Sequence, residues 1–253
     1  MSRFVLTGNR AYNVDCMELM REVPDQYFDL AVVDPPYGGG CSQSVHVERE
    51  RELRGGAADF ERRKRSRFGG RFDCYHIGGA DGRRMVEKVP AGTTEAVDAD
   101  IRHWDIAPPP EYFRELARVS KHQIIWGGNY FGLPPTRCFL IWRKLTISEN
   151  FSMAMAEYAW TSFNDNAKVF DAAPQGADLF HPTQKPVALY AWIYARYAKA
   201  GYRILDTHLG SGSSRIAAYE AGLDFIGCEI DRYYFDRQEQ RFADYAAQCS
   251  LFR

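Results

Sequence analysis

Short apolar runs alternate along the chain with segments whose apolar residues recur every three or four positions. The first pattern predicts strands and the second predicts helices. Residues 28–34, FDLAVVD, are apolar at nearly every position, as a parallel strand covered on both faces would be. Residues 184–198 have helical spacing and carry a proline in the first turn.

The other predicted elements continue this alternation. Strands are expected at 3–8, 121–131, 137–144 and 155–163, and helices at 15–23 and 108–120. Residues 202–222 and 223–249 each predict a strand followed by a helix. Strands that alternate with helices indicate an α/β fold, with a Rossmann-like, doubly wound and mostly parallel sheet.

Residues 41–103 break the rhythm because they contain few apolar runs. Between Glu48 and Arg71, nine Lys or Arg residues stand against five Asp or Glu. A loop of this length inside a compact domain is usually functional or mobile. We therefore interpret 1–253 as a single domain with a basic insertion at about 41–103. The simpler alternative for the basic cluster is a solvated, flexible run of charge.

Composition narrows the class of protein. The net charge of -1 gives no global preference for nucleic acid or membrane, so a charged partner must meet a local patch. No apolar run approaches the roughly 18 residues of a membrane span, and the first residues lack the apolar core of a secretory signal. The six cysteines are scattered without a C-x-x-C pair, which fits a reducing compartment. We expect a cytoplasmic protein with no membrane partner.

A zinc site formed by Cys41, His46, Cys74 and His76 is the metal hypothesis that the sequence allows. The spacings within these pairs match no ordinary zinc ribbon or finger. We expect ordinary loop residues here and no bound metal.

A glycine-rich turn follows the predicted strand that ends at Asp206. Gly210 and Gly212 come next, and Glu229 ends the following strand. Ligands of such sheets bind at the carboxyl ends of the strands, and glycines let the backbone approach them closely. An acid at the position of Glu229 suits the two hydroxyls of a ribose.

Other nucleotide loops fit this turn less well. A dinucleotide fingerprint needs glycine at position 215, where the chain has Arg215, and the Gly-Lys-Ser/Thr of a Walker loop is absent. An acid before Gly-x-Gly without a third glycine instead resembles the S-adenosylmethionine loop of Rossmann-type methyltransferases. The alternative is a plain glycine-rich turn.

The motif Asp34-Pro35-Pro36-Tyr37 directly follows the buried strand 28–34. Two prolines cannot continue a central strand, so a carboxylate and a ring are held on a stiff turn. DPPY resembles the catalytic motif of methyltransferases that act on planar exocyclic amines. HPTQKP at 181–186 is similar to the segment before the cofactor loop in β-class DNA amino-methyltransferases. Catalytic motif, HPTQKP and glycine loop also follow the order of that class.

This resemblance covers nearly the whole chain outside 41–103. It implies a circularly permuted S-adenosylmethionine-dependent methyltransferase fold, with Asp34, Pro35, Pro36 and Tyr37 as catalytic residues. The residues it implies at the cofactor are Asp15, Cys16, Thr183, Lys185, Asp206, His208, Gly210, Ser211, Gly212 and Glu229. Asp15 would face the adenine, and Lys185 or Thr183 would lie near the cofactor carboxylate. The alternatives are a turn or helix-cap role for Asp34 and a solvated position for Lys185.

Two departures from the family pattern affect the interpretation. The family usually has Asp-Pro-Phe before the glycines, whereas this chain has Asp206-Thr207-His208. His208 either packs against the cofactor or simply fills the same space, and we favour the second. No long recognition domain separates Phe163 from His181, so DNA contacts are assigned to the basic insertion. These predicted contacts are Arg62, Arg63, Lys64, Arg65 and Arg67.

The chemistry explains why the motif has these residues. An adenine amino nitrogen is a poor nucleophile because its lone pair is delocalised into the ring. Asp34 and the carbonyl of Pro35 can accept its two hydrogens, and the prolines fix these acceptors before the reaction. Tyr37 offers a stacking face for a base flipped out of the duplex. Residues 126–131, WGGNYF, either lie near that base, as in the family, or pack at a strand end.

The resemblance therefore implies a site-specific DNA adenine-N6 methyltransferase, with double-stranded DNA as its partner. Cytosine-N4 enzymes more often have Ser before Pro-Pro, and enzymes that methylate a protein glutamine typically have Asn there. A catalytically silent DNA-binding module is the alternative from another class. A homodimer is suggested by the resemblance, whereas the recognition sequence and any restriction endonuclease partner are unknown from the sequence.

Overall fold

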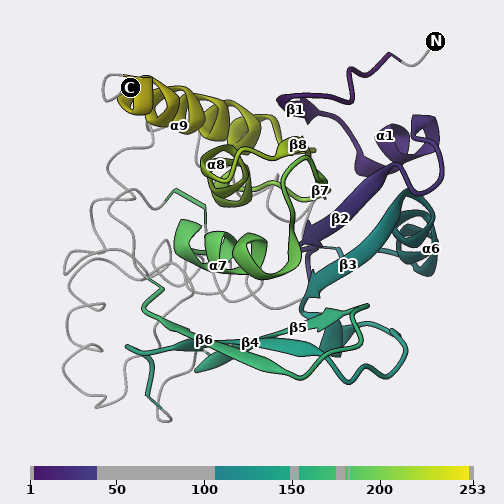
Figure 1. Cartoon of the computed structure of the whole chain (residues 1–253), viewed down its shortest axis with the longest axis vertical. Helices are drawn as coiled ribbons and strands as arrows, with labels where there is room; N and C mark the ends of the chain where they lie inside the picture. Colours follow the sequence, from purple (N-terminus) through teal and green to yellow (C-terminus); the bar gives the residue numbers. More distant parts are fainter. Residues whose placement is uncertain (1–2, 39–105, 149–153, 175–179, 182, 251–253) are drawn as a thin grey trace, which may run out of the picture.

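A computed structural model describes residues 3–38, 106–148, 154–174, 180–181 and 183–250. Within them, one eight-stranded sheet has the order β1-β8-β7-β2-β3-β5-β4-β6 (Figure 1). The strands are β1 (Asn9–Asn13), β2 (Phe28–Val33), β3 (Ser120–Trp126), β4 (Phe139–Lys144), β5 (Ala156–Thr161), β6 (Lys168–Ala172), β7 (Arg203–Asp206) and β8 (Asp224–Glu229). β5 runs antiparallel to β3 and β4, and the other paired strands are parallel. The predicted mostly parallel sheet is confirmed.

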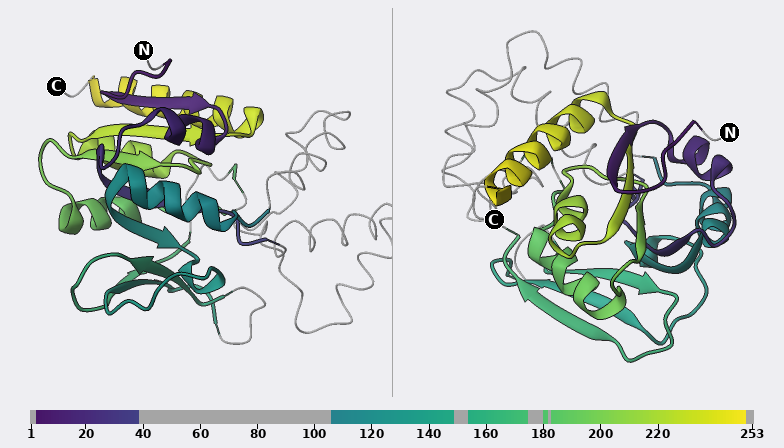
Figure 2. Two further views of the ribbon diagram at one scale, coloured as in Figure 1. Left: turned by 90° about the vertical axis from the view of Figure 1, so that its right-hand side faces the viewer. Right: turned by 45° about the horizontal axis from the view of Figure 1, so that its top comes forward.

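Helices cover both faces of the sheet, as a doubly wound fold requires. They are α1 (Cys16–Glu22), α6 (Pro110–Val119), α7 (Val187–Tyr197), α8 (Ser213–Glu220) and α9 (Arg232–Ser250). α1 and α6 bury Leu19 and Leu116 on one face, while α7 and α8 bury Leu189 and Ala218 on the other. Figure 1 shows the two pairs on opposite sides of the strands. The long α9 packs against α8, β1 and β8 (Figure 2).

The sequence-based prediction was wrong at both edges of the sheet. The first strand is not 3–8 but β1, which pairs with β8 from Asn9 to Asn13. In the stretch before it, Val5 exchanges backbone hydrogen bonds with the hydroxyl of Tyr12, which replaces ladder pairing. The opposite edge strand, β6, was not predicted at all. Edge strands are covered on fewer sides, so both contain polar residues and give a weak hydrophobic signal.

The order of strands places the site. β7 leads through α8 to β8 on one side, whereas on the other side it pairs with β2, which leads through α6 to β3. The direction of winding therefore reverses between β7 and β2, where open α/β sheets bind their ligands. These two strands end at Asp206 and beside Asp34.

The predicted basic insertion at about 41–103 lies outside the described residues. Among the helices that the structure does describe, none combines the length and the apolar character needed to cross a membrane.

Candidate functional site

The turn after β2 holds the carboxylate of Asp34 from two sides. The hydroxyl of Tyr37 donates to Asp34 Oδ1 at 2.9 Å, and the ammonium of Lys185 donates to Oδ2. Pro35 is buried beneath this turn. Because both oxygens are already anchored, the carboxylate has a fixed direction, as the stiff DPPY turn predicts.

Tyr37 belongs to an aromatic stack with Tyr130. The two rings lie 4.8 Å apart at 21°, and the side chain of Tyr130 is 62% exposed. Gly127, in the left-handed region at φ +68°, lies directly against Tyr37, and a Cβ there would come within 2.0 Å of Tyr37 Cε1. The segment 126–131 therefore packs on the ring of Tyr37, and Gly127 is required for that approach.

Lys185 belongs to a larger group of buried charges. Its Nζ lies 2.9 Å from Glu157 Oε2, and Lys144 Nζ lies 2.6 Å from Glu157 Oε1. Burial alone would raise the pKa of Glu157, but the ammonium groups of Lys185 and Lys144 outweigh it and hold the pKa at about 2. For Asp34, burial raises the pKa, Lys185 opposes the rise, and Glu157 adds to it. Glu157 and Lys144 could not be predicted as site residues from the sequence, because each lies in an ordinary strand pattern.

The assignment of Lys185 to the cofactor carboxylate stays a prediction, because its ammonium already contacts two carboxylates. The solvated alternative is wrong, since Lys185 is 3% exposed. Thr183 is exposed, and its backbone N–H donates to His181 Nδ1 at 3.3 Å.

The glycine loop after β7 surrounds the second group of acids. Asp206 Oδ1 accepts the backbone N–H of His208 at 3.1 Å, and the Ser214 hydroxyl donates to Oδ2. Glu229 Oε2 accepts the N–H of Gly210 at 2.7 Å, and Oε1 accepts that of Asp231 at 2.9 Å. Burial raises the pKa of Asp206 and of Glu229 to about 7.

Left-handed backbone gives this loop its shape. Gly210 has φ +52° and Gly212 has φ +75°, and Gly212 is the N-cap of α8. The hydroxyl of Ser211, between them, lies 3.2 Å from that of Ser213. The predicted strand, glycine turn and helix are therefore confirmed, with each glycine in a conformation that a side chain would strain.

Asp15 and Cys16 begin α1 at the same end of the sheet. Asp15 Oδ1 accepts the N–H of Met17 at 2.7 Å, so its carboxylate caps the helix. Asn13, at the end of β1, pairs in register with Glu229, which brings the start of α1 close to that acid. Burial, with Asp15 adding, raises the pKa of the Cys16 thiol to about 12. Both residues lie at the end of the sheet that carries Glu229, and their assignment to the cofactor stays a prediction.

His208 packs against Tyr112 of α6. The rings meet edge to face at 5.3 Å, and the Thr207 hydroxyl lies 3.0 Å from His208 Nδ1. Burial lowers the pKa of His208 to about 4, so the imidazole is neutral near pH 7. This contact fits the interpretation that His208 fills space beside the loop.

The segment 181–186 connects the two ends of the site. A Cβ on Gly210 would lie 3.2 Å from His181 Nε2, so the imidazole sits on the glycine loop. Four residues later, Lys185 forms an ion pair with Asp34 in the turn after β2. One short segment therefore fixes the Asp34 turn relative to the β7 loop.

Other predicted contacts fall outside the described residues. They are the basic residues Arg62, Arg63, Lys64, Arg65 and Arg67 and the alternative metal ligands Cys41, His46, Cys74 and His76. In the part of the chain that the structure describes, no group of His, Cys, Asp or Glu is arranged to hold a metal ion.

Comparisons with known proteins find relatives among methylases. Over 63 residues the chain is 35% identical to YubD of Escherichia coli (strain K12), described as a methylase, covering 25% of this chain and 28% of that protein. Over 61 residues it is 38% identical to the type II methyltransferase M2.DpnII of Streptococcus pneumoniae, covering 24% and 23%. The chain thus matches about a quarter of the length of these curated relatives.

Solved structures extend the likeness of fold to nearly the whole chain. The M1.HpyAVI–SAM complex has a TM-score of 0.52 at 13% identity and covers 92% of this chain and 98% of that chain. The cytosine-N4-specific PvuII DNA methyltransferase has a TM-score of 0.53 at 11% identity and covers 94% and 92%. Residues 112–240, just over half of the chain, match the family model described as DNA methylase. The chain belongs to this DNA methylase family, the N6/N4 amino-methyltransferases.

Proposed function

We propose that this chain transfers a methyl group from S-adenosylmethionine to the N6 amino group of an adenine flipped out of double-stranded DNA. Membership of the DNA methylase family supports the reaction class. The observation that carries the proposal is the position of Asp34. Its carboxylate is fixed by Tyr37 and Lys185 at the end of β2, next to the β7 loop that holds Asp206.

The residues of the β7 loop fit the proposed cofactor. Asp206 and Glu229 are buried carboxylates. Their hydrogen-bond donors among the described residues are neutral, namely backbone amides and one hydroxyl. A ligand with positive charge and ribose hydroxyls would complete them. Glu229 would accept from the ribose, while Asp206 and the Gly210–Gly212 backbone would line the rest. When bound, S-adenosylmethionine supplies an electrophilic methyl group on a sulfonium.

Asp34 and Pro35 act on the target amine. Asp34 accepts one amino hydrogen and the Pro35 carbonyl accepts the other, which favours a tetrahedral nitrogen whose lone pair can attack. The hydrogen bonds of Asp34 to Tyr37 and Lys185 fix its orientation in advance, so little reorganisation opposes the reaction. Tyr37, positioned by Gly127 and Tyr130, stacks on the base.

Adenine is the preferred target because Asp34 precedes the two prolines, where cytosine-N4 enzymes more often have Ser. The basic residues Arg62, Arg63, Lys64, Arg65 and Arg67 are proposed to contact DNA phosphates, since clustered Lys and Arg supply sequence-independent affinity. A homodimer is also proposed from the family resemblance, and a cytoplasmic location from the scattered cysteines, which form no C-x-x-C pair.

The decisive experiment measures transfer of a labelled methyl group from S-adenosylmethionine to double-stranded DNA. Nucleoside analysis of the product should show N6-methyladenine in DNA treated with the wild-type protein and none with Asp34→Ala. N4-methylcytosine would instead support the cytosine alternative. Cofactor and DNA binding without any transfer would support a silent binding module and contradict the proposal.

A further inference from the structure

Four charged side chains form a continuous series of ion pairs at the catalytic turn. Lys144 comes from β4, Glu157 from β5, Lys185 from the segment before α7 and Asp34 from the end of β2. Lys144 and Lys185 lie on different oxygens of Glu157, at 2.6 and 2.9 Å, and Lys185 also pairs with Asp34. Two ammonium groups and two carboxylates leave this charge quartet with no net charge.

The charge quartet differs from a surface salt bridge. Lys144 and Lys185 are 7% and 3% exposed, and a charge removed from water is costly unless it is paired. Arg143 is the neighbour of Lys144 on β4, and its bridge to Asp171 of β6 is about half exposed, at 57% and 40%. Only the buried series connects to Asp34.

One ammonium serves two carboxylates within this quartet. Lys185 contacts both Asp34 and Glu157, so its interaction with Glu157 weakens its interaction with Asp34. Lys144 contacts Glu157, and among the described residues it forms no ion pair with Asp34. Lys144 therefore offsets part of the negative charge of Glu157, so Lys185 interacts more strongly with Asp34.

We propose that Glu157 and Lys144 are positioning residues for Asp34, and that their competition for Lys185 sets how strongly Lys185 holds the catalytic carboxylate. This inference rests on the proposed function, in which ionised Asp34 accepts a hydrogen bond from the target amine. If Lys185 held Asp34 too tightly, the carboxylate would be a poor acceptor. If Lys185 held it too weakly, the buried carboxylate would take up a proton.

The surroundings of Asp34 allow the signs to be worked out. Burial raises the pKa of Asp34, the charge of Glu157 raises it further, and Lys185 lowers it. Among the described residues, the other titratable groups that interact with the quartet are Tyr37, Tyr190 of α7, Asp206 of β7 and His181. Burial, with the charge of Lys185 adding, lowers the pKa of His181 to about 3, so its imidazole is neutral near pH 7. Burial raises the pKa of both tyrosines well above the usual value, so neither titrates near neutral pH. Asp206 has a pKa of about 7 and does titrate near neutral pH, but this residue is unchanged in every variant used below.

The experiment compares the pH dependence of methyl transfer in charge variants. Glu157→Gln should release Lys185 to Asp34, so the acid limb of kcat should move to lower pH by about one unit. Lys144→Met should strengthen the interaction of Glu157 with Lys185 and weaken that of Lys185 with Asp34. The acid limb should therefore move to higher pH by a similar amount. The double variant Glu157→Gln/Lys144→Met should have the same acid limb as Glu157→Gln, because Lys144 acts on Asp34 through the charge of Glu157. The matched control, Arg143→Gln on the same strand, should leave the limb in place.

A second measurement separates this inference from the proposed function. Carboxyl carbon NMR on the unliganded full chain should show the same opposite shifts in the titration of Asp34, whether or not the chain methylates DNA. If the wild type shows no transfer, the proposed function fails while this titration still tests the quartet. If activity falls in both single variants with an unmoved acid limb and an unmoved Asp34 titration, the two residues support the fold alone and the inference is wrong.

Discussion

The two ends of the site treat buried carboxylates in opposite ways. At the proposed catalytic end, Asp34 and Glu157 are paired with ammonium groups. At the β7 loop, Asp206 and Glu229 accept hydrogen bonds from backbone amides and a hydroxyl, and burial raises the pKa of each to about 7. Among the described residues, the first end pairs its carboxylates with ammonium groups, whereas no cationic side chain is hydrogen-bonded to the carboxylates of the second.

This difference indicates what each end can bind. A neutral group such as an amine can bind at Asp34 without changing the balance of charge, because Asp34 only has to accept a hydrogen bond from it. A cationic ligand suits the β7 loop, because it supplies the charge that the protein leaves out. The proposed reaction needs both: a neutral nucleophile at one end and a sulfonium donor at the other.

The largest effect is expected from Asp34→Ala, which tests whether the catalytic end acts on the amine alone. Loss of one preorganised acceptor should slow methyl transfer by roughly 100- to 1000-fold. Cofactor affinity should be retained, because the β7 loop is untouched. Single-turnover transfer and calorimetric titration of S-adenosylmethionine measure the two quantities separately.

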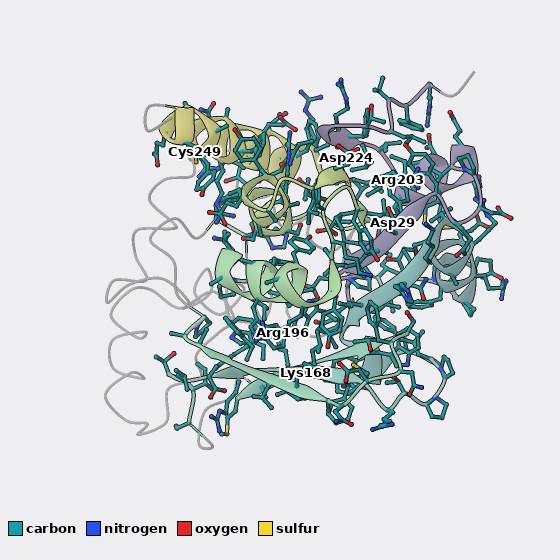
Figure 3. The ribbon with its side chains drawn as sticks, viewed as in Figure 1. Asp29, Lys168, Arg196, Arg203, Asp224 and Cys249 are labelled. Atoms are coloured by element: carbon teal, nitrogen blue, oxygen red, sulfur yellow. The ribbon has the colours of Figure 1, made fainter. Side chains whose placement is uncertain are left out.

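The matched control is Asp29→Asn. Asp29 lies near the amino end of the same strand, where Lys121 and Arg203 contact it. Figure 3 labels Asp29 and Arg203. The Asp29→Asn variant should keep wild-type transfer. Near-normal turnover in Asp34→Ala would remove Asp34 from the mechanism.

A smaller effect is expected from Glu229→Ala, which tests the cofactor end. A hydrogen bond to a charged group contributes about 1.5–3 kcal/mol, so loss of the ribose acceptor should weaken cofactor affinity by about 10- to 100-fold. Transfer at saturating cofactor should fall much less than in Asp34→Ala. Titration calorimetry measures the affinity.

The control for this prediction is Asp224→Asn at the amino end of β8, the opposite end of the strand that carries Glu229 (Figure 3). Its cofactor affinity should equal that of the wild type. An unchanged affinity in Glu229→Ala would place the ribose elsewhere.

Residues at strand ends could be predicted from the sequence, whereas the charge quartet could not. Asp34 and Asp206 lie where a buried apolar run meets prolines or glycines, so their position at the carboxyl ends of strands could be predicted from the sequence. Glu157 lies within β5, where alternation suggests an outward-facing residue. Only the antiparallel insertion of β5 between β3 and β4 brings it to Lys185.

The edges of the sheet show the same limit. β1 and β6 owe their place to pairing with β8 and β4, and their polar residues give little sign of it. Tertiary pairing decided these elements where local preference was weak. The mostly parallel sheet, its glycine loop and the helices at 15–23 and 108–120 were predicted because each has a strong local signal, such as the Asp15 cap or the prolines before α6.

The smallest effect is expected from pH, and it sharpens the contrast between the two ends. Glu229 has a pKa of about 7 in the unliganded chain, and ribose hydroxyls and a cation favour its ionised form. Below pH 7 the carboxyl is protonated, so binding must first remove the proton, and affinity for S-adenosylmethionine should fall by about tenfold from pH 8 to pH 6. Calorimetry at pH 6 in two buffers of different ionisation enthalpy should also detect proton release on binding. Glu229→Gln cannot titrate here, so its affinity should depend less steeply on pH, while titration of the cofactor itself is common to both proteins. Parallel pH curves for the wild type and Glu229→Gln would mean that Glu229 does not need to be ionised, and the charge contrast between the two ends would then rest on Asp206 alone.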